Sequence, residues 1–338
     1  MAPKVIFLLH ATGRCGGIRV VAEYASRLTE RGVDAEIWTP PAPKFSWYSR
    51  PLVHRVFNSL DELGRVARAT RAAKIATWWE TAYWTAETAI MGDRGFYLTQ
   101  DIETTYANSA VQRDRILASY KLGLTPLPTS RWVEHQLSQY SDTPSHFVGL
   151  GIDLDMFCPL PMAREQFRIF CPYRPEAGNG DLKGWLCARV AADHCRSLEP
   201  RTSLVTFGQS GSPRDIPDGL PHIHVSNVSD LKLRELYSQA GVFVMPSNHE
   251  GFGLTALEAM ACGCPVVMTR CNGNGEYLRH GVNCLSAGPG EASALGEHCA
   301  AIMQDAALAS RLSYQGMETV REYDWRFAID RMKAAIFS

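Results

Sequence analysis

Two carboxylates eight positions apart, Glu250 and Glu258, flank a glycine-rich turn in the second half of the chain. The turn, Gly251-Phe252-Gly253, precedes a segment with helical spacing, and the first amides of a helix bind anions well. These amides suit a diphosphate, one glutamate suits the hydroxyls of a sugar, and the other suits those of a ribose. The spacing therefore favours a nucleotide sugar as ligand.

The elements around this turn predict its place in a fold. Residues 242–245 form an apolar run that Pro246 ends, which indicates a buried strand. Residues 254–262 have helical spacing up to Gly263, and residues 264–268 predict the next strand. In such a strand–loop–helix–strand unit the loop lies at the carboxyl edge of a parallel sheet, where α/β proteins bind anionic ligands.

The chain begins with a similar unit. Residues 4–10 predict a strand covered on both faces, and a glycine-rich loop leads from it into a helix. The loop lacks the G-x-G-x-x-G fingerprint, which argues against a dehydrogenase. Gly16 and Gly17 at the start of the helix would let a phosphate approach closely. Close packing of the helix on the sheet is the alternative explanation.

Aromatic and acidic residues follow two further predicted strands of the first half. Residues 78–84 hold three of the eight tryptophans, and Trp79 and Glu80 lie among them. Aromatic planes beside a carboxylate suit a bound sugar, although core packing explains them equally well. Asp101 and Glu103 end a strand that begins near residue 97. They are candidate binding groups, and helix capping would explain one of them.

Composition excludes several classes of protein. The chain has 338 residues, 46% hydrophobic and 20% charged, which predicts two soluble domains with ample cores. A net charge of −1 argues against nucleic-acid binding. The ten cysteines form no C-x-x-C pair, which indicates reduced thiols in a cytoplasmic protein rather than zinc or disulfides. No apolar run approaches the ~18 residues of a membrane span, and we find no signal peptide.

A basic stripe is the one feature that points towards a membrane. A capping box at residues 59–62 predicts a helix, and four cations then recur at every third position: Arg65, Arg68, Arg71 and Lys74. Such spacing predicts one face of a helix. Such a stripe would suit peripheral contact with an anionic inner membrane face, or binding of a lipid-linked diphosphate. A solvated surface is an equally good explanation.

The run from Tyr237 to Glu276 resembles the E-x7-E motif of retaining glycosyltransferases of the GT-B fold, in particular glycosyltransferase family four. The resemblance includes the Pro246-Ser247 step, both glutamates and the segment Cys262-Gly263-Cys264-Pro265-Val266-Val267. Arg174 and Lys183-Gly184 resemble the family's Arg…Lys-Gly signature. Gly16-Gly17 resembles its G-G-x-x-x-x-V segment, and residues 100–103 resemble the Q-D-x-E of a rhamnosyltransferase-like branch.

The resemblance implies an α/β protein of GT-B architecture, with two Rossmann-like parallel-sheet domains facing across a cleft. Residues 1–152 would form the acceptor-side domain and residues 153–321 the donor domain. A C-terminal helix, about 322–338, would return to the first domain. The linker near residues 148–159 resembles the family's G-I-D-x-x-x-F segment and also spells D-x-D. Because it is rich in Gly and Pro, we interpret Asp153 as a turn former rather than a metal ligand.

The resemblance also implies a function. We expect a hexosyl- or deoxyhexosyltransferase that moves a sugar, with retention and without metal or cofactor, from a nucleotide diphosphate sugar. The acceptor would be a glycan, a lipid-linked compound or a small molecule, and Trp79, Glu80, Asp101 and Glu103 would lie on its side. Arg174 and Lys183 would stabilise the leaving diphosphate, and Glu250 would hold the donor sugar. The remaining donor-binding candidates are Gly16, Gly17, Asn227, Val228, Phe252, Gly253, Leu254, Thr255 and Glu258.

Two alternatives stay open at this point. A nucleotide-sugar epimerase shares this architecture, and release of isomerised sugar nucleotide without an acceptor would favour it. A sugar-nucleotide binding module without turnover is the other alternative. The complete set of Arg174, Lys183, Glu250 and Glu258 argues against a mere binding module. The sequence specifies neither the base, the sugar and the acceptor nor the oligomeric state.

Overall fold

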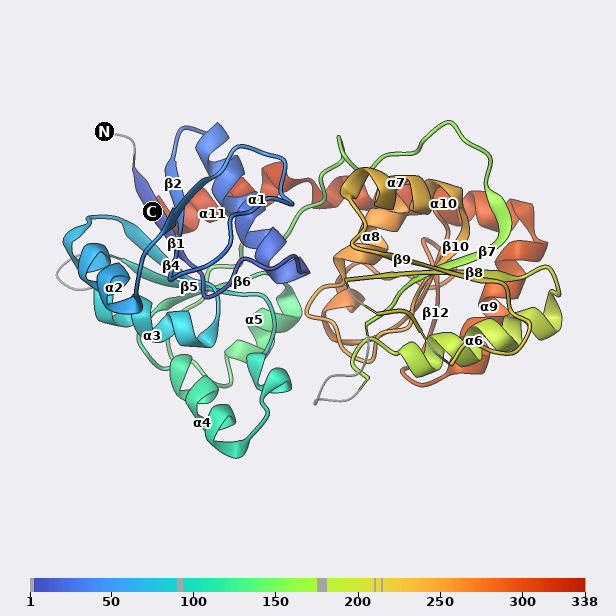
Figure 1. Cartoon of the computed structure of the whole chain (residues 1–338), viewed down its shortest axis with the longest axis horizontal. Coiled ribbons are helices and arrows are strands. Elements are labelled where there is room, and N and C mark those ends of the chain that lie inside the picture. The colour runs from blue at the N-terminus through green and yellow to red at the C-terminus, as the bar shows by residue number, and fades with distance from the viewer. Residues whose placement is uncertain (1–2, 90–93, 175–180, 210, 214, 338) are drawn as a thin grey trace. The chain divides into compact units, whose positions relative to one another are not determined.

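The computed structural model describes residues 3–89, 94–174, 181–209, 211–213 and 215–337. The chain divides into two compact units. Unit 1 comprises Met1–Leu150 and Arg326–Ser338, and unit 2 comprises Gly151–Trp325. Each unit contains one six-stranded sheet in which every pair of neighbouring strands is parallel (Figure 1). The prediction of an α/β protein with two Rossmann-like parallel sheets is therefore confirmed.

The sheet of unit 1 has the strand order β3-β2-β1-β4-β5-β6. Its strands are β1 (Lys4–Leu8), β2 (Asp34–Thr39), β3 (Val53–Val56), β4 (Ala73–Ala76), β5 (Gly95–Thr99) and β6 (Thr125–Pro128). The helices of this part of the chain are α1 (Gly16–Glu30), α2 (Leu60–Ala69), α3 (Trp79–Thr88), η1 (Glu103–Tyr106), α4 (Ala110–Ser119), α5 (Arg131–Leu137) and α11 (Trp325–Phe337).

The sheet of unit 2 has the equivalent order, β12-β11-β10-β7-β8-β9. Its strands are β7 (Glu165–Pro172), β8 (Ser203–Gly208), β9 (His222–Ser226), β10 (Ala240–Met245), β11 (Val266–Thr269) and β12 (Leu285–Ala287). Its helices are α6 (Trp185–Leu198), α7 (Asp230–Gln239), α8 (Leu254–Ala261), η2 (Asn272–Glu276), α9 (Ala292–Gln304), α10 (Ala306–Val320) and η3 (Arg321–Tyr323).

Each sheet has one point where the strand order reverses. The chain adds strands outward from β1 on one side and then returns to place β4 on the other, so the loops after β1 and β4 diverge. The same reversal separates β7 from β10 in unit 2. Diverging loops open a crevice at the carboxyl ends of the two strands, and this is where open α/β sheets bind ligands.

Apolar strands explain why both sheets lie inside their units. Every residue of β10 and β11 is buried, as are Val5 to Leu8 of β1. Continuous apolar strands of this kind need helices on both faces of the sheet. In unit 2, α6 and α9 pack on the sheet through a shared cluster that includes Ala191, Cys195 and Cys299. All ten cysteines are free thiols, and eight of them are buried.

The predicted four-residue basic stripe is wrong. Helix α2 ends at Ala69 because Thr70 adopts an extended conformation, so Arg71 lies beyond the helix. Lys74 lies in β4 with 0% of its surface exposed, and its ammonium donates to the carbonyl of Thr70. Only Arg65, Arg68 and Arg71 are exposed. Among the residues that the structure describes, every helix is too short or too polar to cross a membrane.

Candidate functional site

The crevice between β7 and β10 of unit 2 contains a lysine–glutamate ion pair. Lys183 lies in the loop between β7 and α6, and Glu250 lies in the loop after β10. The Lys183 ammonium donates to Glu250 Oε1 at 2.6 Å, and the hydroxyl of Ser247 donates to the same oxygen at 2.7 Å. The side chains of Lys183 and Glu250 are 27% and 12% exposed. Two groups that the sequence separates by 67 positions thus meet at the predicted edge of the sheet.

Backbone contacts hold the lysine loop against the glutamate loop. The amide of Asn248 donates to the carbonyl of Leu182 at 3.0 Å, and its side-chain amide donates to the carbonyl of Asp181 at 2.7 Å. Gly184 has φ of +69°, and a β-carbon there would lie 1.9 Å from the carbonyl oxygen of Pro246. Only glycine therefore fits beside Lys183.

A third loop, after β11, supports Glu250 from the other side. The amide of Gly273 donates to the carbonyl of Glu250 at 3.0 Å. A β-carbon on Gly273 would lie 1.8 Å from the carbonyl oxygen of Gly251, so this contact also requires glycine. The side chain of Asn272 is hydrogen-bonded to the imidazole of His249. The main chain on both sides of Glu250 is therefore fixed by its neighbours.

Helix α8 begins beside this ion pair. Its N-cap is Gly253, with φ of +89°, and no side chain caps the helix. The first amides of α8, including those of Leu254 and Thr255, thus start a helix with no side-chain acceptor of their own, which is the arrangement that binds phosphates. The Thr255 hydroxyl donates to the sulfur of Met245 at 3.5 Å.

Phe252 and Glu258 are the inward-facing members of the motif. The ring of Phe252 is buried against Tyr277 and Tyr323, with ring centroids 5.6 and 5.7 Å away. Only its main chain therefore remains for ligand contact. Glu258, in the second turn of α8, is buried and accepts a hydrogen bond from the Tyr237 hydroxyl at 3.2 Å. Burial and then the charge of Glu258 raise the pKa of Tyr237 well above its ordinary value, so this phenol remains a donor.

The other donor-side candidates lie at the ends of β7 and β9. Arg174 is exposed two residues after β7, and residues 175–180 of the longer loop lie outside the described residues. Asn227 is exposed after β9, with φ of +51°, and its amide donates to the carbonyl of Gly208 at 2.9 Å. Val228 is buried. Asp153 accepts from the amides of Asp155 and Met156, which confirms its role as a turn former.

In unit 1, Gly16 and Gly17 begin α1, which lacks a side-chain cap. A β-carbon on Gly16 would meet no heavy atom of the described residues within 4 Å, and one on Gly17 would meet only the side chain of Gln100, at 3.5 Å. Close packing against the sheet therefore does not require either glycine in this structure. Approach of a ligand to this backbone stays a prediction.

The predicted acceptor-side residues separate into surface and interior. Trp79 is 4% exposed and belongs to the core, which is the packing alternative. Glu103 is 2% exposed and accepts from the amide of Trp79 at 2.7 Å. Asp101 accepts from the Tyr106 hydroxyl at 2.6 Å. Glu80 is half-buried in the first turn of α3. Trp79, Glu103 and Asp101 are thus all interior residues of unit 1, and their contact with a ligand stays a prediction.

Burial changes the charge of Glu103. It raises the pKa of this carboxyl to about 8, and the negative charges of Asp101 and Glu80 add to the shift. The amide of Trp79 opposes the shift by donating to Glu103. Glu103 is therefore mostly a neutral acid at pH 7 in the interior of unit 1, where Asp101 is buried as well.

Three aromatic residues meet at this edge of unit 1. Trp78 belongs to the predicted run 78–84, whereas His10 and Tyr106 were missed from the sequence. His10 follows β1, Trp78 follows β4 and Tyr106 ends η1. The rings of His10 and Trp78 stack with centroids 5.7 Å apart and planes at 29°. Trp78 and Tyr106 have centroids 6.1 Å apart. A usable signal existed, since His10 ends one predicted strand and Trp78 and Tyr106 follow two others.

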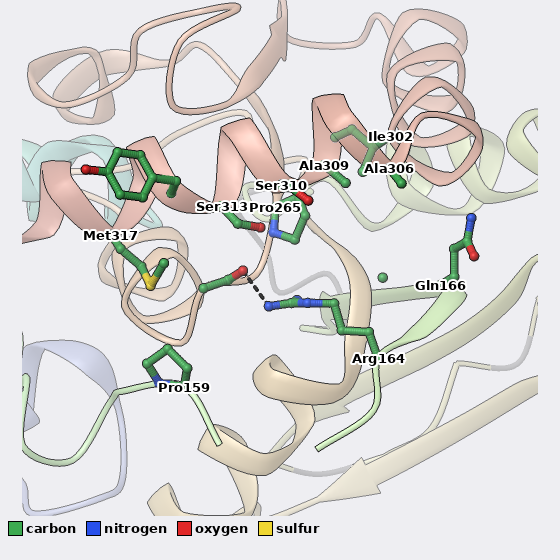
Figure 2. A pocket seen from close by; sticks show the side chains of 13 residues that line it. Pro159, Arg164, Gln166, Pro265, Ile302, Ala306, Ala309, Ser310, Ser313 and Met317 are labelled. Carbon is green, nitrogen blue, oxygen red and sulfur yellow. Dashed lines mark hydrogen bonds between the residues drawn. The ribbon is translucent and has the colours of Figure 1, made fainter. Parts of the chain in front are cut away.

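A separate pocket of about 500 Å³ lies at the opposite edge of the unit 2 sheet, before β7 and β11 (Figure 2). Figure 2 shows Arg164 beside Pro159, Pro265 and Met317. The guanidinium of Arg164 donates to the carbonyls of Gly263 and Ala240 at 2.6 and 3.0 Å. This pocket contains neither Lys183 nor the glutamates. Within the described ranges, no three His, Cys, Asp or Glu residues gather as metal ligands would.

Comparison with known proteins connects this site to a family. The family of glycosyl transferases group 1 matches residues 221–319. A D-inositol 3-phosphate glycosyltransferase of Gordonia bronchialis is 26% identical and covers 95% of this chain and 83% of its own length. A glycogen synthase of Mycobacterium tuberculosis is 29% identical, and the chain spans only 42% of that protein.

Solved structures show the fold of the whole chain. HepE of Anabaena, crystallised with UDP and glucose, superposes with a TM-score of 0.79 at 14% identity over 99% of both chains. This likeness concerns the fold alone, and it is the GT-B fold that the sequence predicts. None of these comparisons supports the epimerase alternative. Together with the group 1 domain, they show that the chain is a glycosyltransferase of the GT-B fold.

Proposed function

We propose that this enzyme moves a sugar from a nucleotide diphosphate sugar to a glycan, lipid-linked or small-molecule acceptor, with retention and without metal. The nucleotide sugar is a co-substrate, and no other cofactor takes part. The observation that carries this proposal is the Lys183–Glu250 pair at 2.6 Å beside the uncapped start of α8. A cation, a carboxylate and unpaired helix amides are the groups that a sugar diphosphate needs at one place.

Stabilising the leaving group is the main chemical task. As the glycosidic bond breaks, the sugar becomes oxocarbenium-like and negative charge develops on the diphosphate. Lys183 and the amides of Gly253 and Leu254 stabilise that negative charge, and Arg174 supplies a second cation. We propose that Gly16 and Gly17 also contribute to donor binding, since their backbone is open to a ligand.

The hydrogen bonds of Glu250 bear on which route to retention we propose. One of its oxygens already accepts from Lys183 and Ser247, which favours orienting the donor sugar over attacking it. We therefore propose substitution on one face through a short-lived ion pair, with no covalent intermediate. Glu258 accepts from the ribose hydroxyls, and the main chain of Asn227 and Val228 borders the base.

Donor binding is the first test. A ligand at a hundred times its dissociation constant stabilises a protein by about 2.7 kcal/mol, which is visible as a rise in Tm. We would compare UDP-, GDP-, dTDP- and ADP-sugars, beginning with UDP-glucose because HepE has been crystallised with it. If none of the four classes raises Tm, the proposed donor is wrong.

Stereochemistry and metal dependence form the second test. Proton NMR of the first product should show the donor's own anomeric configuration, and EDTA should leave the rate unchanged. An inverted product would contradict the one-face substitution. Loss of activity that Mn²⁺ restores would contradict the metal-free mechanism.

A further inference from the structure

We propose that His10, Trp78 and Tyr106 form a stacking platform for an uncharged sugar ring, and that this ring belongs to the acceptor. The platform itself is inferred from unit 1 alone; its assignment to the acceptor rests on the proposed function. Aromatic side chains with a few polar neighbours are the usual lining of sites that hold the apolar face of a ligand.

The platform occupies the ligand-binding place of its sheet. His10 follows β1 and Trp78 follows β4, which are the two strands at the reversal of strand order. Their rings stack with centroids 5.7 Å apart. Tyr106 extends the aromatic surface past the neighbouring strand β5, 6.1 Å from Trp78. His10 is exposed and the other two are half-buried, so ring surface remains available to a ligand.

The scaffold holds the platform in place without a ligand. The amide of Trp78 donates to the Thr81 hydroxyl at 3.0 Å, and the next amide, of Trp79, donates to Glu103 at 2.7 Å. Tyr106 is fixed through its hydroxyl to Asp101 at 2.6 Å. These bonds fix the main chain at Trp78 and the ring of Tyr106 in advance, so binding loses less conformational freedom there.

Nearby charges favour a neutral, hydroxyl-bearing ligand. Glu80 lies two residues after Trp78, and its charge acts on His10. Asp101 accepts from the Tyr106 hydroxyl and is itself buried, so Glu80 is the more exposed of the two carboxylates. Carboxylates accept hydrogen bonds from sugar hydroxyls, whereas they repel phosphate. The platform therefore favours a pyranose ring over a phosphorylated group as the part of the acceptor bound here.

Saturation-transfer NMR on the full chain tests this proposal with defined probes. The probes are methyl α-glucoside, methyl α-mannoside and maltotriose, with glycerol 3-phosphate as the anionic comparison. We expect saturation of ring protons of at least one neutral probe and none of glycerol 3-phosphate. Trp78→Ala should weaken that binding about 3- to 10-fold, the range of an aromatic contact, while Trp78→Phe should retain part of it.

Control variants distinguish a loss of sugar binding at the platform from misfolding and from a loss of donor binding. Tyr314→Ala removes an exposed ring of unit 2 and should change nothing. If Trp78→Ala fails to fold, His10→Ala removes an exposed ring instead. Equal binding by the wild type and the folded variant, or saturation of glycerol 3-phosphate alone, overturns the platform. Sugar binding that depends on Trp78 without any nucleotide-induced rise in Tm retains the platform but refutes the proposed transfer reaction.

Discussion

The two sheets have the same strand order, yet the side chains across their reversal points differ. In unit 1 the residues after β1 and β4 are His10 and Trp78, whose rings stack. In unit 2 the loops after β7 and β10 bring Lys183 and Glu250 into an ion pair. One crevice offers ring surface, and the other offers charge and helix amides.

This difference shows how far topology alone determines a site. The reversal of strand order fixes where a ligand can bind, because it makes neighbouring loops diverge. Residue type then decides what binds there. A lysine paired with a carboxylate suits a sugar diphosphate, whereas stacked rings suit the apolar face of a sugar.

The largest effect should come from Glu103, the buried carboxyl that accepts from the amide of Trp79. Burial holds the pKa of Glu103 at about 8, against 4.5 for an ordinary glutamate. In the unfolded chain this carboxyl ionises near pH 4.5, while the folded chain keeps its proton until about pH 8. Stability is therefore full below pH 4.5 and falls as pH rises towards 8, in total by on the order of 4 kcal/mol.

Glu103→Gln removes this dependence, because the amide is neutral at every pH and can still accept from Trp79. We expect the variant to match the wild type near pH 4.5 and to have a clearly higher Tm at pH 8. Calorimetry at both pH values checks this. Glu87→Gln, an exposed change in α3, is the control. Equal Tm for wild type and Glu103→Gln at pH 8 would show that Glu103 is ionised.

Lys183→Ala tests the charged side of the contrast. Losing one donor to a developing negative charge costs about 10²- to 10³-fold in kcat. The Michaelis constant for the donor should change less, because Lys183 acts most strongly as charge develops. Steady-state kinetics with Lys232→Ala, an exposed lysine, as control measures both constants. Near-normal kcat would mean that the loop before α6 does not present Lys183 to the diphosphate. Arg174→Ala should behave like Lys183→Ala.

Much of the fold and of the donor-side site could be predicted from the sequence, for reasons that differ between the units. Apolar strands of four to six residues, such as β10 and β11, predict a parallel sheet. The donor motif is nearly contiguous, so Glu250, the Gly253 turn and Glu258 follow from one loop and one helix. Lys183 followed from the family's signature, and the structure brings it to Glu250.

The misses come from boundaries that shift by a residue or a turn. Trp78 keeps an extended conformation as N-cap while Trp79 begins α3, so one tryptophan lies at the surface and its neighbour in the core. The spacing of the aromatic residues could not show which of the two tryptophans would be buried. Lys74 repeats the three-residue interval of Arg65 and Arg68, but α2 has already ended and the lysine lies in β4. Periodicity shows a face only while the helix continues.

Glu258→Ala should have an intermediate effect on donor binding. A hydrogen bond to a charged group contributes roughly 1.5–3 kcal/mol, which corresponds to about 10- to 150-fold in affinity. The ribose is bound equally in the ground and transition states, so the loss should raise KM for the donor and leave kcat nearly constant. Tyr237→Phe, which removes only the hydroxyl that donates to Glu258, should produce a smaller rise. A fall in kcat at constant KM would refute the ribose role.

Gly16→Ala should have the smallest effect and decides whether unit 1 also binds charge. The added β-carbon meets no heavy atom of the described residues within 4 Å, and alanine favours a helix by up to about 1 kcal/mol over glycine. Stability should therefore stay constant or rise slightly. If the diphosphate approaches this backbone, the methyl group keeps it away and KM for the donor rises while Tm of the free protein does not fall. An unchanged KM together with unchanged stability would leave unit 1 with its aromatic platform and no part in holding the donor.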